Sequence, residues 1–235
     1  MLYTALEHAV EGQLIDSNPM QYVKRPKQFR KEMRVLTLDE EATLIQAVRE
    51  WENMNAIGIL IMLFCGLRIG ELLALKWDDI DFRQNHMRIV RTVSRITDEQ
   101  GVSYTVEKHV KTRDSYRTIP IIDKLSDDLQ RHYLLQSIKF GEMKYVFVGK
   151  TGKRNEPRNY QTTFQRIAKK AGISGATPHT MRHTFATRCL ESGMDIKTLA
   201  DLLGHADPQI TLYYYGHSLP EHKIESVAKL SQFYF

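Results

Sequence analysis

The sequence predicts a mainly helical α+β domain with one small antiparallel sheet near its middle. Apolar residues recur at helical spacing before residue 80 and after residue 122, whereas residues 81–122 alternate between polar and apolar. Of the 235 residues, 42% are hydrophobic and 26% are charged, a balance that favours a packed core over a disordered chain. We therefore expect helices before and after a three-stranded sheet along the chain.

The first 31 residues are expected to lie outside the main domain. Apolar residues on one face predict an amphipathic helix over residues 1–16, which Asn18 and Pro19 end. A basic stretch with Pro26 follows, as in a linker. Because one helix cannot bury its apolar face alone, we expect residues 1–31 to be the last helix of a truncated domain plus a linker. Residues 32–235 are expected to form the second domain.

Local signals place the helices of the second domain. Thr37 and Glu40 form a predicted capping box, which starts a helix that reaches about Trp51. A nearly all-apolar helix at 56–65 should be buried, and Gly66 ends it. Further helices are expected from about residue 68 and at 125–138, 160–171, 182–192, 196–203 and 221–235.

Three segments between the helices predict the strands. Met87, Ile89 and Val93 fall among polar residues in the first segment. A turn candidate at 98–101 leads into VSYTVEK, and SYRTIPI follows as the third segment. We expect these segments to pair as one antiparallel sheet.

Bulk properties narrow the class of protein. The net charge of +5 suits a polyanionic partner, although many proteins are equally basic. The longest apolar run, at 57–65, is about half as long as a membrane span, so we expect no membrane association and a cytoplasmic protein. The two cysteines lie in apolar helical patterns without zinc-ligand spacing. The sequence lacks a GxxxxGK[ST] loop and a two-metal carboxylate cluster, so no cofactor or metal is expected.

Two patterns could bind an anion. Arg68 follows a helix break near a helix N-terminus, where backbone N–H groups face anions, and Glu71 is close enough to hold its guanidinium. His179 and Arg182 lie three residues apart on the same side of a helical turn, so together they can bond two phosphate oxygens. Taken alone, each pattern also fits a solvated surface.

Three more patterns contain side chains that can take part in acid–base or nucleophilic chemistry. Lys111 lies between two predicted strands, and His205 follows Gly204 at a helix end. In the run from Tyr213 to Tyr215, successive side chains point about 100° apart, so at most one can face a shared site. A loop lysine, a structural histidine and core aromatic residues are the alternatives when each pattern stands alone.

The order of these patterns resembles the tyrosine recombinase, or phage integrase, family. The matching stretches lie between about residue 32 and the C-terminus: FCGLRIGELLALKWDDID, KTRDSYRTIPI, TPHTMRHTFATRCLESGMDIKTLADLLGHADPQITLYYYGH and LPEHK. They are most similar to integrases of phages and conjugative transposons from Gram-positive bacteria. The resemblance implies a catalytic domain that cleaves and rejoins DNA through a 3′-phosphotyrosyl link without ATP, to integrate or excise a phage genome or mobile element.

The resemblance also implies a role for each residue. Tyr215, ten residues after His205, fits the family's Tyr-x-His ending and is the expected nucleophile; Tyr214, nine residues after, is the alternative. The other implied catalytic residues are the phosphate-clamping Arg68 and Arg182, the general acid Lys111, and the histidines His179 and His205, with Glu71 in support.

The expected partner is double-stranded DNA with att-type sites, bound by a tetramer on synapsed DNA, with an accessory excision factor as a further candidate. Residues 1–31 would end a core-binding domain, and the segment after the nucleophile would pack on a neighbouring subunit. Two alternatives remain: a type IB topoisomerase, which relaxes one duplex, and a catalytically inactive DNA-binding module. All the expected catalytic residue types are present, which disfavours the inactive module.

Overall fold

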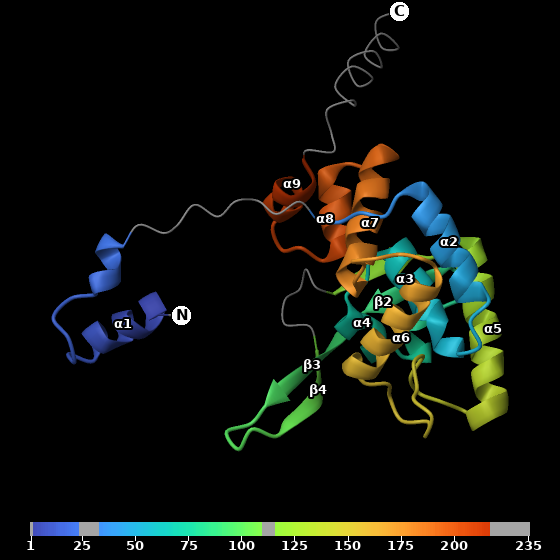
Figure 1. The fold of residues 1–235 in the computed structure, drawn as a ribbon, viewed down its shortest axis with the longest axis horizontal. Helices are drawn as coiled ribbons and strands as arrows, with labels where there is room; N and C mark the ends of the chain where they lie inside the picture. Colours follow the sequence, from blue (N-terminus) through green and yellow to red (C-terminus); the bar gives the residue numbers. More distant parts are fainter. Residues whose placement is uncertain (1, 24–32, 110–115, 217–235) are drawn as a thin grey trace, which may run out of the picture. The chain divides into compact units, whose positions relative to one another are not determined.

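The computed structural model describes residues 2–23, 33–109 and 116–216 (Figure 1). The chain divides into two units, Met1–Glu32 and Met33–Phe235. In the first unit, helix α1 spans Leu2–Glu11 and a 3₁₀ turn spans Pro19–Tyr22. The helix ends at Glu11 rather than near residue 16, because Gln13 has a positive φ of 54°. The Asn18 amide then donates to the Tyr3 carbonyl and the Glu7 carboxylate, at 3.2 and 2.6 Å.

The described part of the second unit is mainly helical. The predicted capping box is confirmed: the Thr37 hydroxyl accepts from the Glu40 amide at 3.2 Å, and the Glu40 carboxylate accepts from the Thr37 amide at 3.0 Å. The helices in chain order are α2 (Leu38–Arg49), α3 (Ile57–Cys65), α4 (Ile69–Ala74), α5 (Asp123–Phe140), α6 (Pro157–Lys170), α7 (Pro178–Glu191), α8 (Ile196–Leu203) and α9 (Pro208–Tyr215), with 3₁₀ turns at Met54–Ala56 and Trp77–Asp79.

Helix α3 is the centre of the main core. Every residue of α3 except Phe64 is buried, as its apolar sequence predicts. The helix contacts α2, α5 and α7, which surround it in Figure 1. Its last turn therefore ends inside the domain, beside α7.

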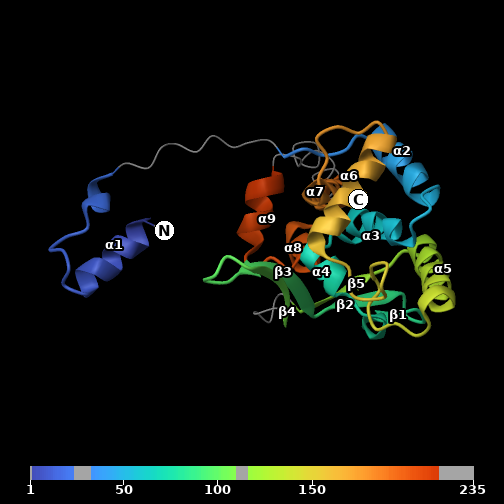
Figure 2. The ribbon, with the colours of Figure 1, turned by 60° about the horizontal axis from the view of Figure 1, so that its bottom comes forward.

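The segment between α4 and α5 forms two antiparallel pairings instead of one. Strands β1 (Ile80–Asp81), β2 (His86–Ile89) and β5 (Arg117–Pro120) make a three-stranded sheet, in the order β1-β2-β5. Strands β3 (Arg91–Thr97) and β4 (Ser103–His109) form a separate hairpin, whose tip extends away from the helices in Figure 1 and Figure 2. The predicted small antiparallel sheet is present, but the chain divides at Val90, so β2 and β3 pair with different partners.

Helix α4 packs closely on the base of this hairpin. A Cβ atom at Gly70 would lie 2.5 Å from the Val93 carbonyl oxygen and 2.6 Å from the Thr92 hydroxyl oxygen. Only a residue without a side chain permits this approach. The contact sets the position of α4 against β3.

A second, smaller core lies under α7, α8 and α9. Its buried members are Ala186, Leu190, Leu199, Leu203 and Tyr215. Tyr215 is therefore anchored by apolar packing at the end of α9. In the part of the chain that the structure describes, no helix is long and apolar enough to cross a membrane.

Candidate active site

Arg68 stands between the end of α3 and the start of α4. Gly66 ends α3 in the left-handed conformation, with φ of 65°, and Arg68 is the N-cap residue of α4. The predicted contact with Glu71 is present, because the guanidinium Nη1 donates to Glu71 Oε1 at 2.9 Å. The Arg68 side chain remains 39% exposed, so an anion can reach it.

Glu71 also binds a second arginine, which sequence reasoning missed. Arg117 at the start of β5 donates to both carboxylate oxygens, at 2.7 and 3.2 Å, and both side chains are buried. Burial would raise the pKa of Glu71, but the positive charges of Arg117 and Arg68 outweigh it and lower that pKa to about 2. Arg117 shares the buried face of β5 with Ile119, a strand alternation that could have identified it.

Arg182 on α7 is buried and held by main-chain oxygens. Its Nη1 donates to the Gly66 carbonyl and its Nη2 to the Leu203 carbonyl, both at 2.7 Å. These carbonyls lie at the C-terminal ends of α3 and α8, where helices leave unpaired acceptors. Arg68 Nη1 also reaches the Leu203 oxygen, at 3.4 Å. Burial first, then Arg68, lowers the pKa of Arg182 to about 9, so the guanidinium stays charged at neutral pH.

His205 completes the arginine side of the site. Its Nε2 lies 3.0 Å from Arg182 Nη2, and its Nδ1 lies 2.8 Å from the hydroxyl of the buried Thr211. Because arginine only donates, Nε2 must accept and Nδ1 must carry the proton. Burial, followed by the charges of Arg182 and Arg68, lowers the pKa of His205 to about 4, so the ring is neutral at neutral pH.

Two histidines follow one another along α7. His179 lies in the first turn, and the ring of His183 stacks on it one turn later, with centroids 6.3 Å apart. Burial, then Arg182 and Arg68, lowers the pKa of His179. Burial, then His179 and Arg182, lowers the pKa of His183 to about 4. His183 directly follows Arg182 in the sequence, one helical turn after His179, and this spacing was the signal that could have found it.

Of the three consecutive tyrosines, Tyr215 faces this cluster. It is 3% exposed, whereas Tyr213 and Tyr214 are 58% and 42% exposed. The Tyr215 hydroxyl lies 2.6 Å from His183 Nδ1. Burial raises the pKa of Tyr215 to about 12, although the charges of Arg182 and Arg68 act in the opposite direction. The phenol is therefore protonated at neutral pH.

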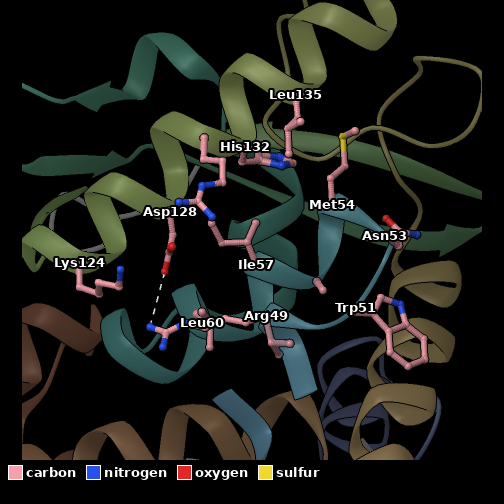
Figure 3. A pocket seen from close by; sticks show the side chains of 13 residues that line it. Arg49, Trp51, Asn53, Met54, Ile57, Leu60, Lys124, Asp128, His132 and Leu135 are labelled. Carbon is pink, nitrogen blue, oxygen red and sulfur yellow. Dashed lines mark ion pairs between the residues drawn. The ribbon is translucent and has the colours of Figure 1, made fainter. Parts of the chain in front are cut away.

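Lys111 lies outside the described residues, as does His217 of the Tyr-x-His ending. Within the described ranges, no group of three or more His, Cys, Asp or Glu side chains could hold a metal ion. A separate pocket of about 260 Å³ opens between α2, α3 and α5 (Figure 3). It is lined by residues such as Trp51, Asp128 and His132 and contains none of the candidate catalytic residues.

Four segments far apart in the sequence thus converge at one point. They are the α3–α4 junction, β5, the first turns of α7, and the α8–α9 region. The site offers the exposed guanidinium of Arg68 to an anion, with the buried guanidinium of Arg182 and a buried tyrosine hydroxyl close by. This arrangement can bind a phosphate and present an oxygen nucleophile to it.

The fold is that of a tyrosine recombinase catalytic domain. Among solved structures, the integrase of the Tn1549 transposon in complex with a circular intermediate DNA superposes with a TM-score of 0.79 at 24% identity, covering 96% of this chain and 76% of that one. A lambda integrase dimer bound to a core site superposes with a TM-score of 0.62 at 18% identity, covering 89% and 70%. At these sequence identities, the two structural similarities are evidence for the fold alone.

Sequence comparison identifies the family. Residues 34–222 match the phage integrase family, and the chain belongs to it. A protein described as tyrosine recombinase XerC-like from Caldanaerobacter subterraneus is 35% identical over 210 residues, covering 83% of this chain and 54% of the relative. A tyrosine recombinase from Thermosipho africanus is 31% identical over 220 residues, covering 92% and 69%. The chain thus spans about half the length of the first relative, and the narrower likeness to Gram-positive elements stays a prediction.

Proposed function

We propose that this chain is the catalytic part of a site-specific DNA recombinase, which cleaves and rejoins DNA through a 3′-phosphotyrosyl intermediate. The observation that carries the proposal is the Tyr215 hydroxyl, which is buried beside His183 while the two preceding tyrosines are exposed. Membership of the phage integrase family supports the same conclusion.

In this proposal, Arg68 and Arg182 clamp the scissile phosphate. A phosphodiester carries one negative charge, and further negative charge develops on its oxygens when a fifth ligand attacks. The two guanidinium groups neutralise that charge, because they are fixed in place before the reaction. Arg68 supplies the exposed donor, and Arg182 is held by the carbonyls of Gly66 and Leu203. Neutral His179 and His205 add hydrogen-bonding groups.

Tyr215 is the proposed nucleophile. Its phenol oxygen bonds to phosphorus, the bond from phosphorus to the 5′ oxygen breaks, and the leaving oxygen takes a proton from Lys111. The free energy of the phosphodiester is kept in the phosphotyrosine, so the reverse attack by a 5′-hydroxyl needs no ATP. The phenol must also lose its proton, because its pKa of about 12 keeps it neutral beforehand.

The proposed partner is double-stranded DNA carrying att-type sites, bound in the cytoplasm by a tetramer that an accessory excision factor could regulate. A recombinase with a similar fold has been solved with DNA: XerH was bound to a palindromic difH substrate in a post-cleavage complex. We assign residues 1–31 to the end of a core-binding domain and its linker, and residues 32–235 to the catalytic domain. The two-unit division at residues 32 and 33 supports this assignment.

Covalent trapping tests the proposal. The chain is incubated with a duplex from the ends of the phage genome or mobile element that encodes it. The duplex is nicked near the cleavage point, so the short fragment with the 5′-hydroxyl diffuses away after cleavage, and the modified peptide is mapped by mass spectrometry. We expect DNA on Tyr215, loss of the adduct in Tyr215→Phe with binding retained, and activity in Tyr214→Phe. DNA attached to Tyr214 would show that Tyr214, not Tyr215, is the nucleophile.

Two other outcomes would replace the proposal. Binding without an adduct on any junction duplex would indicate an inactive DNA-binding module. Relaxation of supercoiled DNA without strand exchange between two duplexes would indicate a type IB topoisomerase.

A further inference from the structure

We infer that His183 is a catalytic residue that accepts the phenolic proton of Tyr215 during DNA cleavage. The inference rests on the proposed function, since it concerns the same reaction. The contact that carries it is the 2.6 Å hydrogen bond between the Tyr215 hydroxyl and His183 Nδ1. A proton acceptor must lie within hydrogen-bond reach of the proton it removes, and this distance satisfies that condition.

The other two histidines are placed differently. Both ring nitrogens of His205 have partners, because Nε2 accepts from Arg182 and Nδ1 donates to Thr211. The His179 ring stacks on His183 rather than on Tyr215. Among the described residues, His183 is the histidine in hydrogen-bond contact with the Tyr215 hydroxyl.

The protonation states agree with this direction of transfer. Burial, His179 and Arg182 lower the pKa of His183 to about 4, so its ring is neutral at neutral pH and one of its two nitrogens has a free electron pair. The Tyr215 phenol is protonated under the same conditions, with a pKa of about 12. In the tautomer of His183 that carries its proton on Nε2, the hydroxyl donates and the imidazole accepts.

DNA binding changes the charge that His183 experiences. In the free chain, His183 lies one residue from Arg182 on α7, and that positive charge disfavours an imidazolium. A phosphodiester held by Arg68 and Arg182 introduces negative charge beside them, which favours the imidazolium. Proton transfer from Tyr215 to His183 thus becomes more favourable only when the substrate is in place.

The geometry of α7 explains how both functions reach one phosphate. Residues three and four apart on a helix share a face, so His179, Arg182 and His183 are neighbours on the same side of α7. One helix turn thereby presents the phosphate-binding arginine and the proton acceptor together. The small core that contains Tyr215 sets α9 against this face.

Each step balances. When Tyr215 Oη bonds to phosphorus, the phenolic proton moves to His183 Nδ1. The bond from phosphorus to the 5′ oxygen breaks, and that oxygen leaves with a proton from the proposed general acid. In the rejoining step, a 5′-hydroxyl attacks phosphorus and gives its proton back to the group that had protonated it, the bond to Tyr215 breaks, and His183 returns its own proton to the phenol oxygen. His183 ends the cycle as it began.

The matched substitution is His183→Asn. The Asn Oδ1 atom can accept the Tyr215 hydrogen bond from about the position of Nδ1, but an amide does not take up the proton. Single-turnover adduct formation on the nicked duplex is measured from pH 5 to pH 10. We expect the His183→Asn rate at pH 7 to fall by about 10²-fold to 10⁴-fold, the usual contribution of proton transfer, while DNA binding is unchanged. The His183→Asn rate should keep rising toward high pH, where hydroxide removes the proton.

Further variants separate proton transfer from positioning. Added imidazole should restore cleavage to His183→Ala but not to His183→Asn, whose side chain fills the space. His86→Asn, on β2, serves as the histidine control and should cleave like the unmodified chain. Thermal melting checks each fold, and His183→Gln replaces any variant that melts early.

Three results would overturn the inference. Wild-type rate and pH profile in His183→Asn would mean that His183 only positions Tyr215. Failure of imidazole to rescue a folded His183→Ala variant would exclude proton acceptance. Absence of any adduct from the unmodified chain would instead remove the proposed function, and this inference with it.

Discussion

Arg182 is fixed in the site by the protein itself. Two main-chain carbonyls, one from each of two helix ends, accept from its guanidinium, and His205 accepts a further hydrogen bond. The positive charge of Arg182 is therefore already in place and needs no reorganisation when an anion binds at Arg68. Arg68 is more exposed, but Glu71 and the Leu203 carbonyl hold it toward the same point.

Removal of either arginine should slow cleavage strongly. We expect Arg68→Ala and Arg182→Ala to lower the single-turnover rate by about 10²-fold or more, as when one charge-stabilising donor is lost. Arg182→Lys should recover little, since a point charge cannot reproduce a planar fork that binds two carbonyls. Full activity in the lysine variants would show that the site needs only charge.

Lys111 can be tested although it lies outside the described residues. If it protonates the leaving 5′ oxygen, Lys111→Ala should lose activity on normal DNA but recover on a substrate with a 5′-thiol leaving group, which departs without a proton. The measurement compares cleavage rates on the oxygen and sulfur substrates. Equal impairment on both would assign Lys111 to phosphate binding.

Glu71 links the site to the pH dependence of stability. Its pKa of about 2 in the folded chain lies below the ordinary value of 4.5, so its stabilising contribution is complete above about pH 5 and is lost as pH falls toward 2. Glu71→Gln should lower the free energy of unfolding at pH 7 by about 3–5 kcal/mol, because Arg117 then stays buried without a counter-ion.

Urea unfolding of both proteins at several pH values checks this prediction. The difference between the unmodified chain and Glu71→Gln should shrink as the pH falls from 5 toward 2. A constant difference across that range would mean that the carboxylate charge contributes nothing.

At the scale of elements, the packing of α4 on β3 positions Arg68. Gly70 follows two residues after Arg68, and its backbone lies against Val93 and Thr92. A side chain at this position would meet backbone atoms, which cannot rotate away. Displacement of α4 would therefore move the N-cap that carries Arg68.

Gly70→Ala should separate this packing from ordinary glycine effects. We expect a loss of about 1–3 kcal/mol in the free energy of unfolding, typical of overpacking, with a fall in cleavage rate. Gly149→Ala is the control, because the nearest atom to its added Cβ would be 3.7 Å away. Equal effects of the two substitutions would contradict a specific contact between α4 and β3.

At the scale of the whole molecule, the C-terminal segment should couple assembly to activity. The sequence predicts a helix over residues 221–235 with Ile224, Val227 and Leu230 on one side, and these residues lie outside the described ranges. The resemblance to tyrosine recombinases implies that this apolar side packs on a neighbouring subunit. Apolar surface of this kind otherwise favours aggregation.

Deletion from Glu221 onward should weaken assembly on paired DNA sites and change the cleavage rate, while the domain stays folded. Thermal melting, the distribution of monomer and tetramer on DNA, and cleavage of the nicked duplex measure the three quantities. Normal assembly and strand exchange without the segment would refute the idea. A large fall in melting temperature would show that the segment packs on its own domain.

Local sequence determined most of the elements and several of the candidate residues. The Thr37 capping box, the apolar helix ended by Gly66 and the helix ended by Gly204 all follow from short-range chemistry, and all are present. The expectation that one of three consecutive tyrosines faces the site also follows from helix geometry, and that tyrosine is Tyr215.

Tertiary structure decided which groups meet. The Glu71–Arg117 pair joins residues 46 positions apart, and the His183–Tyr215 contact joins residues 32 apart, so no local period encodes either. The division of the predicted strand at Val90 likewise depends on partners brought in from β5 and β4. Local spacing sets the direction of a side chain along its own helix or strand, whereas the packing of α3, α7, α8 and α9 sets what that side chain touches.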